Sequence, residues 1–182
     1  LSKKKDKNKE FSKKDLILFN RSIITNNKKK IKKANFYIVT VPTPINKKQE
    51  PDLKFLKSAL SIIGKNLKQD DIVFVESTIY PSVTQSVCIP ILEKESGLKS
   101  NEDFIVGYSS ERINPGDKKH SVENIKKVVA IETNKKKILY KVKAIYKTIS
   151  KKIVLSQFIK EAETSKVIEN VQRDLNIALM NE

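Results

Sequence analysis

Short runs of apolar, β-branched residues alternate along the chain with longer segments of helical periodicity. The runs are nearly continuous, which is typical of strands buried on both faces. Strands are therefore predicted over residues 35–41, 71–77, 104–109, 128–131 and 152–155, with a shorter one over 22–25. Apolar residues spaced three or four apart predict helices over 53–67, 82–95, 134–150 and 158–182. Asn26 or Asn27 is expected to cap a short basic helix that ends near Lys33.

This alternation of strands and helices predicts the α/β class, with a doubly wound parallel sheet covered by helices on both faces. In the helix over 82–95, the residues expected to face inward are Val83, Val87, Pro90 and Ile91. The long last helix is expected to lead into a second domain. Neither an internal repeat nor a low-complexity linker divides the chain before that helix.

The last helix has two contrasting faces. Lys166, Asn170 and Arg173 form one narrow polar stripe, at about 100° per residue. The opposite face is apolar and is expected to pack against other structure; it comprises Ile168, Val171, Leu175, Ala178 and Leu179. Lys166 and Asn170 are one turn apart, so both can donate to one developing oxyanion. A solvated polar face is the alternative interpretation of the same stripe.

Composition narrows the chemistry available to this chain of 182 residues and 20.8 kDa. Cys88 is the only cysteine, which excludes a disulfide framework and a thiolate metal cluster, and its apolar neighbours predict a buried thiol. His120 is the only histidine, which argues against a zinc site or a Ser-His relay. No metal is expected. No apolar stretch is long enough for a membrane span, so a cytoplasmic protein without a membrane partner is predicted.

The charge of +16 comes almost entirely from lysine, because Arg21, Arg112 and Arg173 are the only arginines among 37 basic residues. Specific nucleic-acid readout favours arginine, whose planar fork binds two acceptors at once. A general lysine bias therefore explains the charge better than a specific nucleic-acid partner does. Non-specific attraction to polyanions at low salt is still expected.

Two segments with candidate chemistry follow predicted strands. Ligands bind beyond the carboxyl ends of strands in open parallel sheets, which is where both segments fall. In the first, Pro42 and Pro44 bracket Thr43, which suits either a ligand contact or a rigid turn. In the second, Ser77 and Thr78 lie between a strand and a helix start. They are candidates for contacts to a ribose or phosphate, or for helix caps.

A third segment follows the strand over 104–109 and places Glu111 beside Arg112, ahead of an Asn-Pro-Gly-Asp turn. A glutamate at the mouth of a sheet can act as a general base or orient a water molecule. A surface ion pair between the two side chains is the alternative. The turn itself is ordinary loop chemistry.

Taken together, these segments resemble the nucleotide-sugar dehydrogenases of the UDP-glucose/GDP-mannose dehydrogenase family. The resemblance runs from about residue 22 to residue 182 and is strongest to the branch that oxidises UDP-N-acetylglucosamine or UDP-N-acetylgalactosamine at C6. The segments that carry it are VPTPI (41–45), PDL (51–53), ESTIYP (76–81), CIPILEKESGLK (88–99), SSERINPGDK (109–118) and KVIENVQRDLNIALMNE (166–182).

The resemblance implies a four-electron oxidation in which two NAD molecules accept hydride and the C6 alcohol becomes a carboxylate through a thioester. Thr43 and Thr78 would contact NAD. Glu111 would be the acid/base residue that acts on water, and Lys166, assisted by Asn170, would stabilise oxyanions. The product would be a uronic acid for surface polysaccharides. The implied partners are the UDP-sugar substrate and a second copy, bound through the central helix.

The resemblance also implies how the chain is organised. Residues 1–157 would form a partial, Rossmann-like NAD-binding domain, and residues 158–182 would begin the helical dimerisation domain. The family's GxGxxG loop is expected to precede this chain, and its catalytic cysteine and UDP-binding domain to follow Glu182. The chain alone is therefore expected to be inactive. A non-catalytic interaction module with a basic surface is the alternative function.

Overall fold

The computed structural model describes residues 22–110 and 125–182, which fall into two units divided between Lys33 and Ala34. In the first unit, the basic helix η1 spans Lys28–Lys33, and its start is capped as predicted, because the Asn27 Oδ1 accepts the Lys29 N–H at 3.0 Å. The strand predicted over 22–25 is wrong, since residues 22–27 have no regular structure. Ile23 is 79% exposed, so no strand among the described residues buries this β-branched segment.

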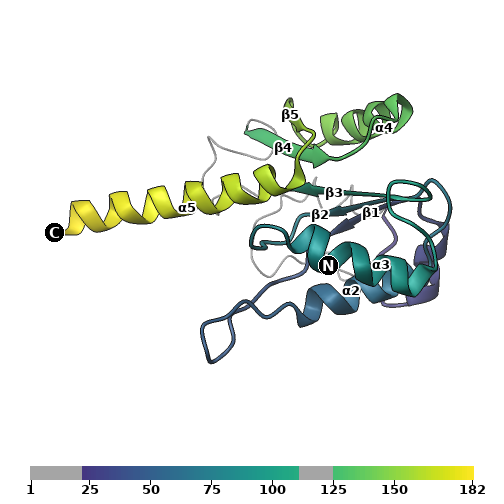
Figure 1. The fold of residues 1–182 in the computed structure, drawn as a ribbon, viewed down its shortest axis with the longest axis horizontal. Helices are drawn as coiled ribbons and strands as arrows, with labels where there is room; N and C mark the ends of the chain where they lie inside the picture. The colour runs from purple at the N-terminus through teal and green to yellow at the C-terminus, as the bar shows by residue number, and fades with distance from the viewer. Residues whose placement is uncertain (1–21, 111–124) are drawn as a thin grey trace. The chain divides into compact units, whose positions relative to one another are not determined.

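The second unit is a five-stranded sheet with helices, drawn in Figure 1. The strands lie in the order of their sequence: β1 (Phe36–Val39), β2 (Ile72–Val75), β3 (Ile105–Ser109), β4 (Lys126–Ile131) and β5 (Lys152–Ser156). The helical elements are α2 (Lys54–Gly64), η2 (Thr84–Cys88), α3 (Ile89–Ser96), α4 (Lys136–Lys147) and α5 (Ile159–Asn181). The α/β class is confirmed.

The sheet is mixed, which corrects the expectation that every strand is parallel. β1, β2 and β3 are parallel, but β4 pairs antiparallel with β3, with Ser109 opposite Val129, and β5 follows β4 in parallel. Parallel neighbours require a crossover, usually a helix. The sequence between β3 and β4 contains the Asn-Pro-Gly-Asp turn and no helical periodicity. As a result, the carboxyl ends of β1, β2 and β3 share one edge with the amino end of β4.

One face of the sheet is covered by α4. The buried cluster there consists of Ile72, Phe74, Ile105, Val129, Ile131, Ile138, Val142 and Tyr146. The Phe74 ring stacks on Phe36 at 5.6 Å between centroids and meets Tyr146 edge-on at 5.0 Å. Gly107 leaves room for the Phe74 ring, since a Cβ at that position would lie 2.4 Å from the Phe74 Cζ. The core therefore depends on a glycine in the central strand.

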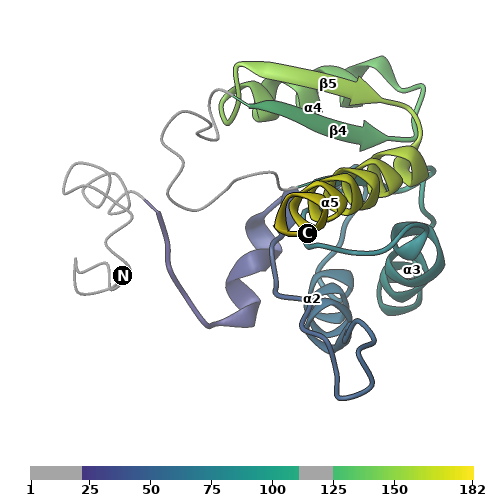
Figure 2. The ribbon, with the colours of Figure 1, turned by 90° about the vertical axis from the view of Figure 1, so that its left-hand side faces the viewer.

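Figure 2 shows α2 and α3 on the side of the sheet away from α4. The residues that η2 and α3 bury are Thr84, Cys88 and Leu92, and Pro90 is exposed, so the prediction that Pro90 faces inward is wrong. The physical reason is the π-helical turn over Thr84–Cys88, in which the Ile89 N–H donates to the Thr84 carbonyl. A π turn adds a residue and shifts the inward face of the helix.

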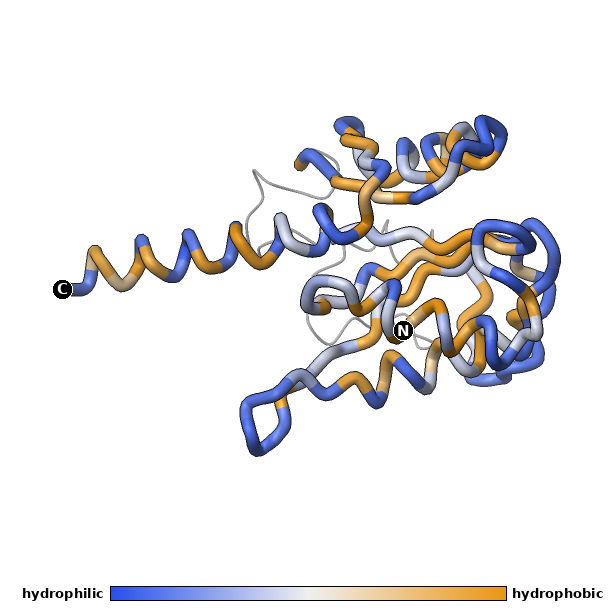
Figure 3. Tube along the Cα trace, in the orientation of Figure 1, coloured by the Kyte–Doolittle hydropathy of each residue, from blue (hydrophilic) through white to orange (hydrophobic). Residues whose placement is uncertain are grey.

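The long helix α5 contacts β3, β4 and β5. Its buried residues are Ile159, Ala162 and Glu163. The apolar face that was expected to pack is exposed, because nothing in the described ranges covers it: Ile168 is 61% exposed and Leu175 is 66% exposed. Figure 3 shows hydrophobic and hydrophilic positions alternating along this helix. Among the described residues, no helix is both long and apolar enough to cross a membrane.

Candidate functional site

The segments after β1 and β2 meet at the shared carboxyl edge of the parallel strands. The Glu76 N–H donates to the Val39 carbonyl at 2.9 Å, which extends the pairing of the two strands by one residue. Beyond this point the Thr43 hydroxyl donates to the Thr78 carbonyl at 2.6 Å. The two threonines singled out from the sequence are therefore direct neighbours. Thr43 is half-buried and the Thr78 side chain is exposed.

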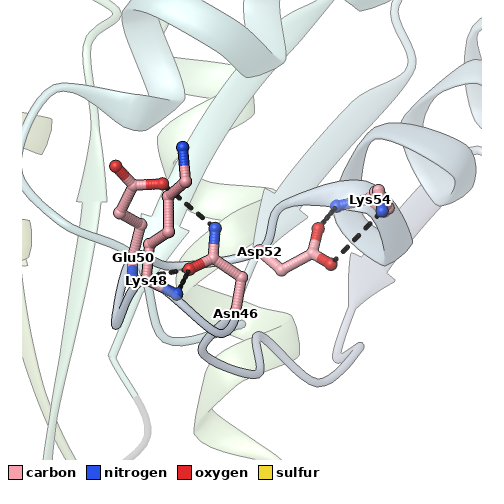
Figure 4. A network of polar contacts seen from close by, with 5 residues as sticks. All are labelled: Asn46, Lys48, Glu50, Asp52 and Lys54. Atoms are coloured by element: carbon pink, nitrogen blue, oxygen red, sulfur yellow. Dashed lines mark hydrogen bonds and ion pairs between the residues drawn. The ribbon is translucent and has the colours of Figure 1, made fainter.

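The loop that follows Thr43 is held in shape by its own polar groups, as Figure 4 shows. The Asn46 Oδ1 accepts the backbone N–H groups of Lys48 and Glu50 at 2.8 and 3.0 Å. At the end of the loop, the Asp52 Oδ1 accepts the Lys54 N–H at 2.9 Å and so satisfies a free donor at the start of α2. The loop thus connects β1 to α2 in a defined conformation.

A buried ion pair lies at the same edge of the sheet. The Lys127 Nζ on β4 donates to the Glu76 Oε2 at 3.0 Å, and the two side chains are only 7% and 11% exposed. The Tyr146 hydroxyl on α4 donates to the Glu76 Oε1 at 2.7 Å. The Lys127 Nζ is also 5.9 Å from the centroid of the Tyr146 ring. Glu76 therefore connects β2, β4 and α4 immediately before Ser77 and Thr78.

The environment of Tyr146 keeps its hydroxyl protonated. Burial raises the pKa of Tyr146 well above its ordinary value, and the neighbouring Glu76 carboxylate raises it further through its charge and its hydrogen bond. An ionised phenol beside a carboxylate would place two negative charges in a buried site. Tyr146 thus acts as a hydrogen-bond donor to Glu76.

The polar stripe on α5 has the geometry that its spacing predicts. Lys166 and Asn170 are one helical turn apart and both are half-buried, whereas Arg173 is exposed. The Asn170 Oδ1 accepts a hydrogen bond from the Arg173 Nη2, which leaves the two amide hydrogens of Asn170 available to another group. In Figure 1, α5 leaves the sheet on the same side as the loop that follows β1.

Two carboxylates join the start of α5 to the segment that follows Thr78. The Glu163 carboxylate is fully buried and accepts the Ser82 and Thr84 N–H groups at 2.5 and 3.0 Å. The Glu132 carboxylate, just after β4, accepts the Gln85 side-chain amide at 3.0 Å and the Ile159 N–H at 3.0 Å. The helix that carries Lys166 is therefore joined directly to the segment that carries Thr78.

Only part of the predicted constellation can be compared with the structure. Thr43 contacts Thr78, and Lys166 and Asn170 share a face of α5. Glu111, and with it the expected Glu111–Lys166 pair, lies outside the described residues, as do Arg112 and His120. The chain up to Ser110 is described, and the Ser109 hydroxyl there donates to the Val128 carbonyl at 2.8 Å. The catalytic and cofactor roles of all five predicted residues remain predictions.

The roles of Glu163, Glu132 and the Glu76–Lys127 pair were not predicted from the sequence. A signal for Glu163 was present, because Ile159, Ala162 and Glu163 are spaced three and four apart on the buried stripe of α5. A carboxylate on such a stripe requires donors from another element. The sequence around Glu163 does not identify those donors, because Ser82 and Thr84 lie about eighty residues before Glu163 in the chain.

Cys88 is a core thiol, as its apolar neighbours predicted. Its side chain is fully buried, and burial, followed by the charge of Glu163, raises the pKa of the thiol to about 12. A nucleophilic cysteine needs the opposite environment, one that is accessible and stabilises the thiolate. Cys88 therefore supplies no reactive thiolate near neutral pH.

Comparison with known proteins identifies the family of the chain. The model of the UDP-glucose/GDP-mannose dehydrogenase family, NAD binding domain, matches residues 8–150. The chain belongs to this family. It is 53% identical over 159 residues to a UDP-N-acetyl-D-glucosamine 6-dehydrogenase of Pseudomonas aeruginosa, covering 87% of this chain and 37% of that protein. It is 50% identical over 159 residues to Protein CapL of Staphylococcus aureus, with the same coverage of 87% and 37%.

Solved structures agree with this assignment. The UDP-D-ManNAc dehydrogenase from Pyrococcus horikoshii matches with a TM-score of 0.82 and 28% identity, covering 93% of this chain and 40% of that one. GDP-mannose dehydrogenase from Pseudomonas aeruginosa matches with a TM-score of 0.84 at 24% identity, over 98% of this chain and 42% of that one, which supports the fold alone. The chain spans less than half the length of each of these relatives.

NAD is the cofactor of this domain family. Thr78, just beyond the carboxyl end of β2, is a candidate contact for it. The Thr78 side chain is exposed there, and its hydroxyl makes no hydrogen bond within residues 22–110 and 125–182. The Thr43 hydroxyl donates a hydrogen bond to the Thr78 carbonyl and so holds the Thr78 backbone in place. A free hydroxyl on a fixed turn at the mouth of parallel strands is suited to the ribose and amide groups of a dinucleotide.

Proposed function

We propose that this chain is the NAD-binding part of a dehydrogenase that oxidises C6 of a UDP-N-acetylhexosamine to the uronic acid. The observation that carries the proposal is the 53% identity, over most of the chain, to UDP-N-acetyl-D-glucosamine 6-dehydrogenases of Pseudomonas aeruginosa and Salmonella typhi. A role in surface polysaccharide synthesis is proposed with it, supported by the similarity to Protein CapL.

In this proposal, Thr43 and Thr78 form the contact to NAD at the carboxyl edge of the sheet. NAD supplies the hydride acceptor. The hydrogen bond between the two threonines supports this role, because it sets the position of the exposed Thr78 before a ligand arrives. A preformed turn loses less conformational freedom on binding than a loose loop does. The cofactor contact would therefore be built into the apo chain.

Lys166 and Asn170 are proposed to stabilise the negative charge that develops on the substrate oxygen at C6. Both are donors, both are half-buried, and both lie on the same face of α5. A cation and an amide held by one rigid helix need little reorganisation during the reaction. Glu111 is proposed to activate the water that releases the acid; in the sequence it is the second residue after Ser109, with which β3 ends.

We further propose that residues 158–182 begin a dimerisation domain and that α5 pairs with a second copy. An exposed apolar stripe along α5 supports this proposal; it consists of Ile168, Val171, Leu175 and Leu179. Substitution of Leu175 by lysine is expected to abolish concentration-dependent association in sedimentation velocity. Unchanged sedimentation of Leu175→Lys would contradict the pairing.

The cofactor assignment is tested by titrating the purified chain with NAD and observing the ligand by saturation-transfer NMR. Thr78→Ala is expected to weaken the transfer to the NAD ribose and nicotinamide protons by several fold. Thr148→Ala, which removes an exposed threonine after α4, is the matched control and should leave it unchanged. Equal transfer in the parent chain and Thr78→Ala would contradict the assignment.

A further inference from the structure

We infer that Glu163 is a positioning residue that sets where Lys166 lies relative to the Thr78 turn. The inference rests on the proposed function, in which Thr78 contacts NAD and Lys166 stabilises an oxyanion. Hydride transfer requires cofactor and substrate to be held in a fixed mutual geometry. The two groups come from elements far apart in the chain, so a link between those elements determines their spacing.

The geometry of Glu163 makes that link direct. Its carboxylate is fully buried, and its two oxygens accept the N–H groups of Ser82 and Thr84. Ser82 is four residues after Thr78, and Glu163 is one helical turn before Lys166. Hydrogen bonds to a charged acceptor are stronger than neutral ones, and two bonds to one carboxylate also restrict its orientation. A shift of α5 along or about its axis would break both bonds.

The segment held by Glu163 begins with an unfavourable backbone conformation. Ser82 has a φ of 74°, in the left-handed region that residues other than glycine rarely adopt. A serine in this region needs compensation from its surroundings. The Ser82 N–H donates to Glu163, and the Ser82 carbonyl accepts the Ser86 N–H and hydroxyl at 2.8 and 2.7 Å. Glu163 therefore contributes to holding the turn that follows Thr78.

The same carboxylate lies at the start of the η2–α3 helical segment. Thr84 is the first residue of η2, where N–H groups have no partner within the helix, and Ser82 lies in the turn just before it. A negative charge is favourable at that end because of the helix dipole. Glu163, which belongs to α5, therefore caps the start of η2 from outside that helix. Removal of its charge should loosen this end without disturbing the sheet.

The first test measures the spacing of the two elements directly. Spin labels are attached at Tyr80→Cys and Ile168→Cys in a Cys88→Ala background, and their distance distribution is measured by pulsed electron resonance. Both label sites are exposed. A narrow distribution is expected in this parent and in the matched control Glu161→Gln, whose carboxylate is exposed on the same helix. Glu163→Gln is expected to broaden or shift it; an unchanged distribution would overturn the inference.

The second test separates a local role from a general loss of stability. Amide hydrogen exchange of Thr84 is expected to accelerate about ten- to a hundredfold in Glu163→Gln, the range for one lost charged hydrogen bond, while Val75 in β2 keeps its protection. Equal acceleration at both amides would overturn the inference. Ser82→Gly, which removes the backbone strain, is expected to reduce the effect of Glu163→Gln on Thr84, and absence of any rescue would contradict the role in the turn.

Neither test uses a nucleotide, so the two proposals can fail separately. Equal saturation transfer to NAD in the parent chain and in Thr78→Ala would refute the proposed cofactor contact. Saturation transfer that depends on Thr78, together with a distance distribution that Glu163→Gln leaves unchanged, would refute the role of Glu163 alone.

Discussion

Substitution of Lys127 by methionine should destabilise the chain strongly, because it leaves the Glu76 carboxylate buried without its cation. The Lys127 Nζ lies 3.0 Å from the Glu76 Oε2, and the two side chains are 7% and 11% exposed. Methionine fills similar space but has no charge and no donor. The Tyr146 hydroxyl would remain as a donor to Glu76, at 2.7 Å.

Loss of one partner from a buried ion pair costs about 3–5 kcal/mol. In a chain of this length, 1 kcal/mol corresponds to roughly 2–4 °C in Tm, so a decrease on the order of 10 °C is expected. Lys126→Met is the matched control, since Lys126 is the neighbouring residue on β4 and is exposed. Urea unfolding followed by circular dichroism measures the free energy of unfolding, and the m-value shows whether the unfolding transition is comparable.

A second substitution tests whether the cost comes from the unpaired charge. In the Lys127→Met background, Glu76→Gln removes that charge while keeping an acceptor for the Tyr146 hydroxyl. It should recover a large part of the lost stability, although Glu76→Gln alone should destabilise the chain. A Lys127→Met variant as stable as Lys126→Met would refute the reasoning, and so would additive effects of the two substitutions.

Three further outcomes are expected. Gly107→Ala should lower the free energy of unfolding by about 1–3 kcal/mol, because the new Cβ would overlap the Phe74 ring, and a Phe74→Leu background should reduce this cost in thermal unfolding. Burial raises the pKa of the Cys88 thiol from 9.0 to about 12 in the folded chain, so its contribution to stability is complete below pH 9 and is lost as pH rises toward 12. Between pH 7 and pH 10 the parent should therefore lose about 1.4 kcal/mol more than Cys88→Ala; equal losses would contradict the shift. The chain should form no NADH from UDP-N-acetylglucosamine and NAD, because its only cysteine is buried, and sustained NADH formation would contradict this.

The sequence predicted the elements well wherever local pattern determines them. The apolar runs became β1 to β5, and Asn27 caps η1 as its position before the lysines indicated. Thr43 and Thr78 could be placed together because each follows a strand, and carboxyl ends of parallel strands share an edge. These inferences needed only periodicity and the rules of parallel sheets.

The remaining features depend on contacts between distant segments. β4 runs antiparallel to β3, and the residues of β4 alone do not determine this direction. Pro90 is exposed because a π turn alters the register of its helix. The spacing of Glu163 on the buried stripe of α5 hints at its burial, but only the fold shows that Ser82 and Thr84 are its donors. Lys127 carries no such signal in the sequence, and its burial against Glu76 also depends on the fold.

The most direct test of the proposed cofactor site is a map of the backbone amides whose NMR signals move when NAD is added to the chain. The signals of the Thr43 and Thr78 amides should shift with the same dependence on NAD concentration, and inorganic pyrophosphate at the same concentration should not reproduce these shifts. Shifts confined to the lysine-rich helix α4, and equal for NAD and pyrophosphate, would show non-specific polyanion binding and would contradict the proposed cofactor site.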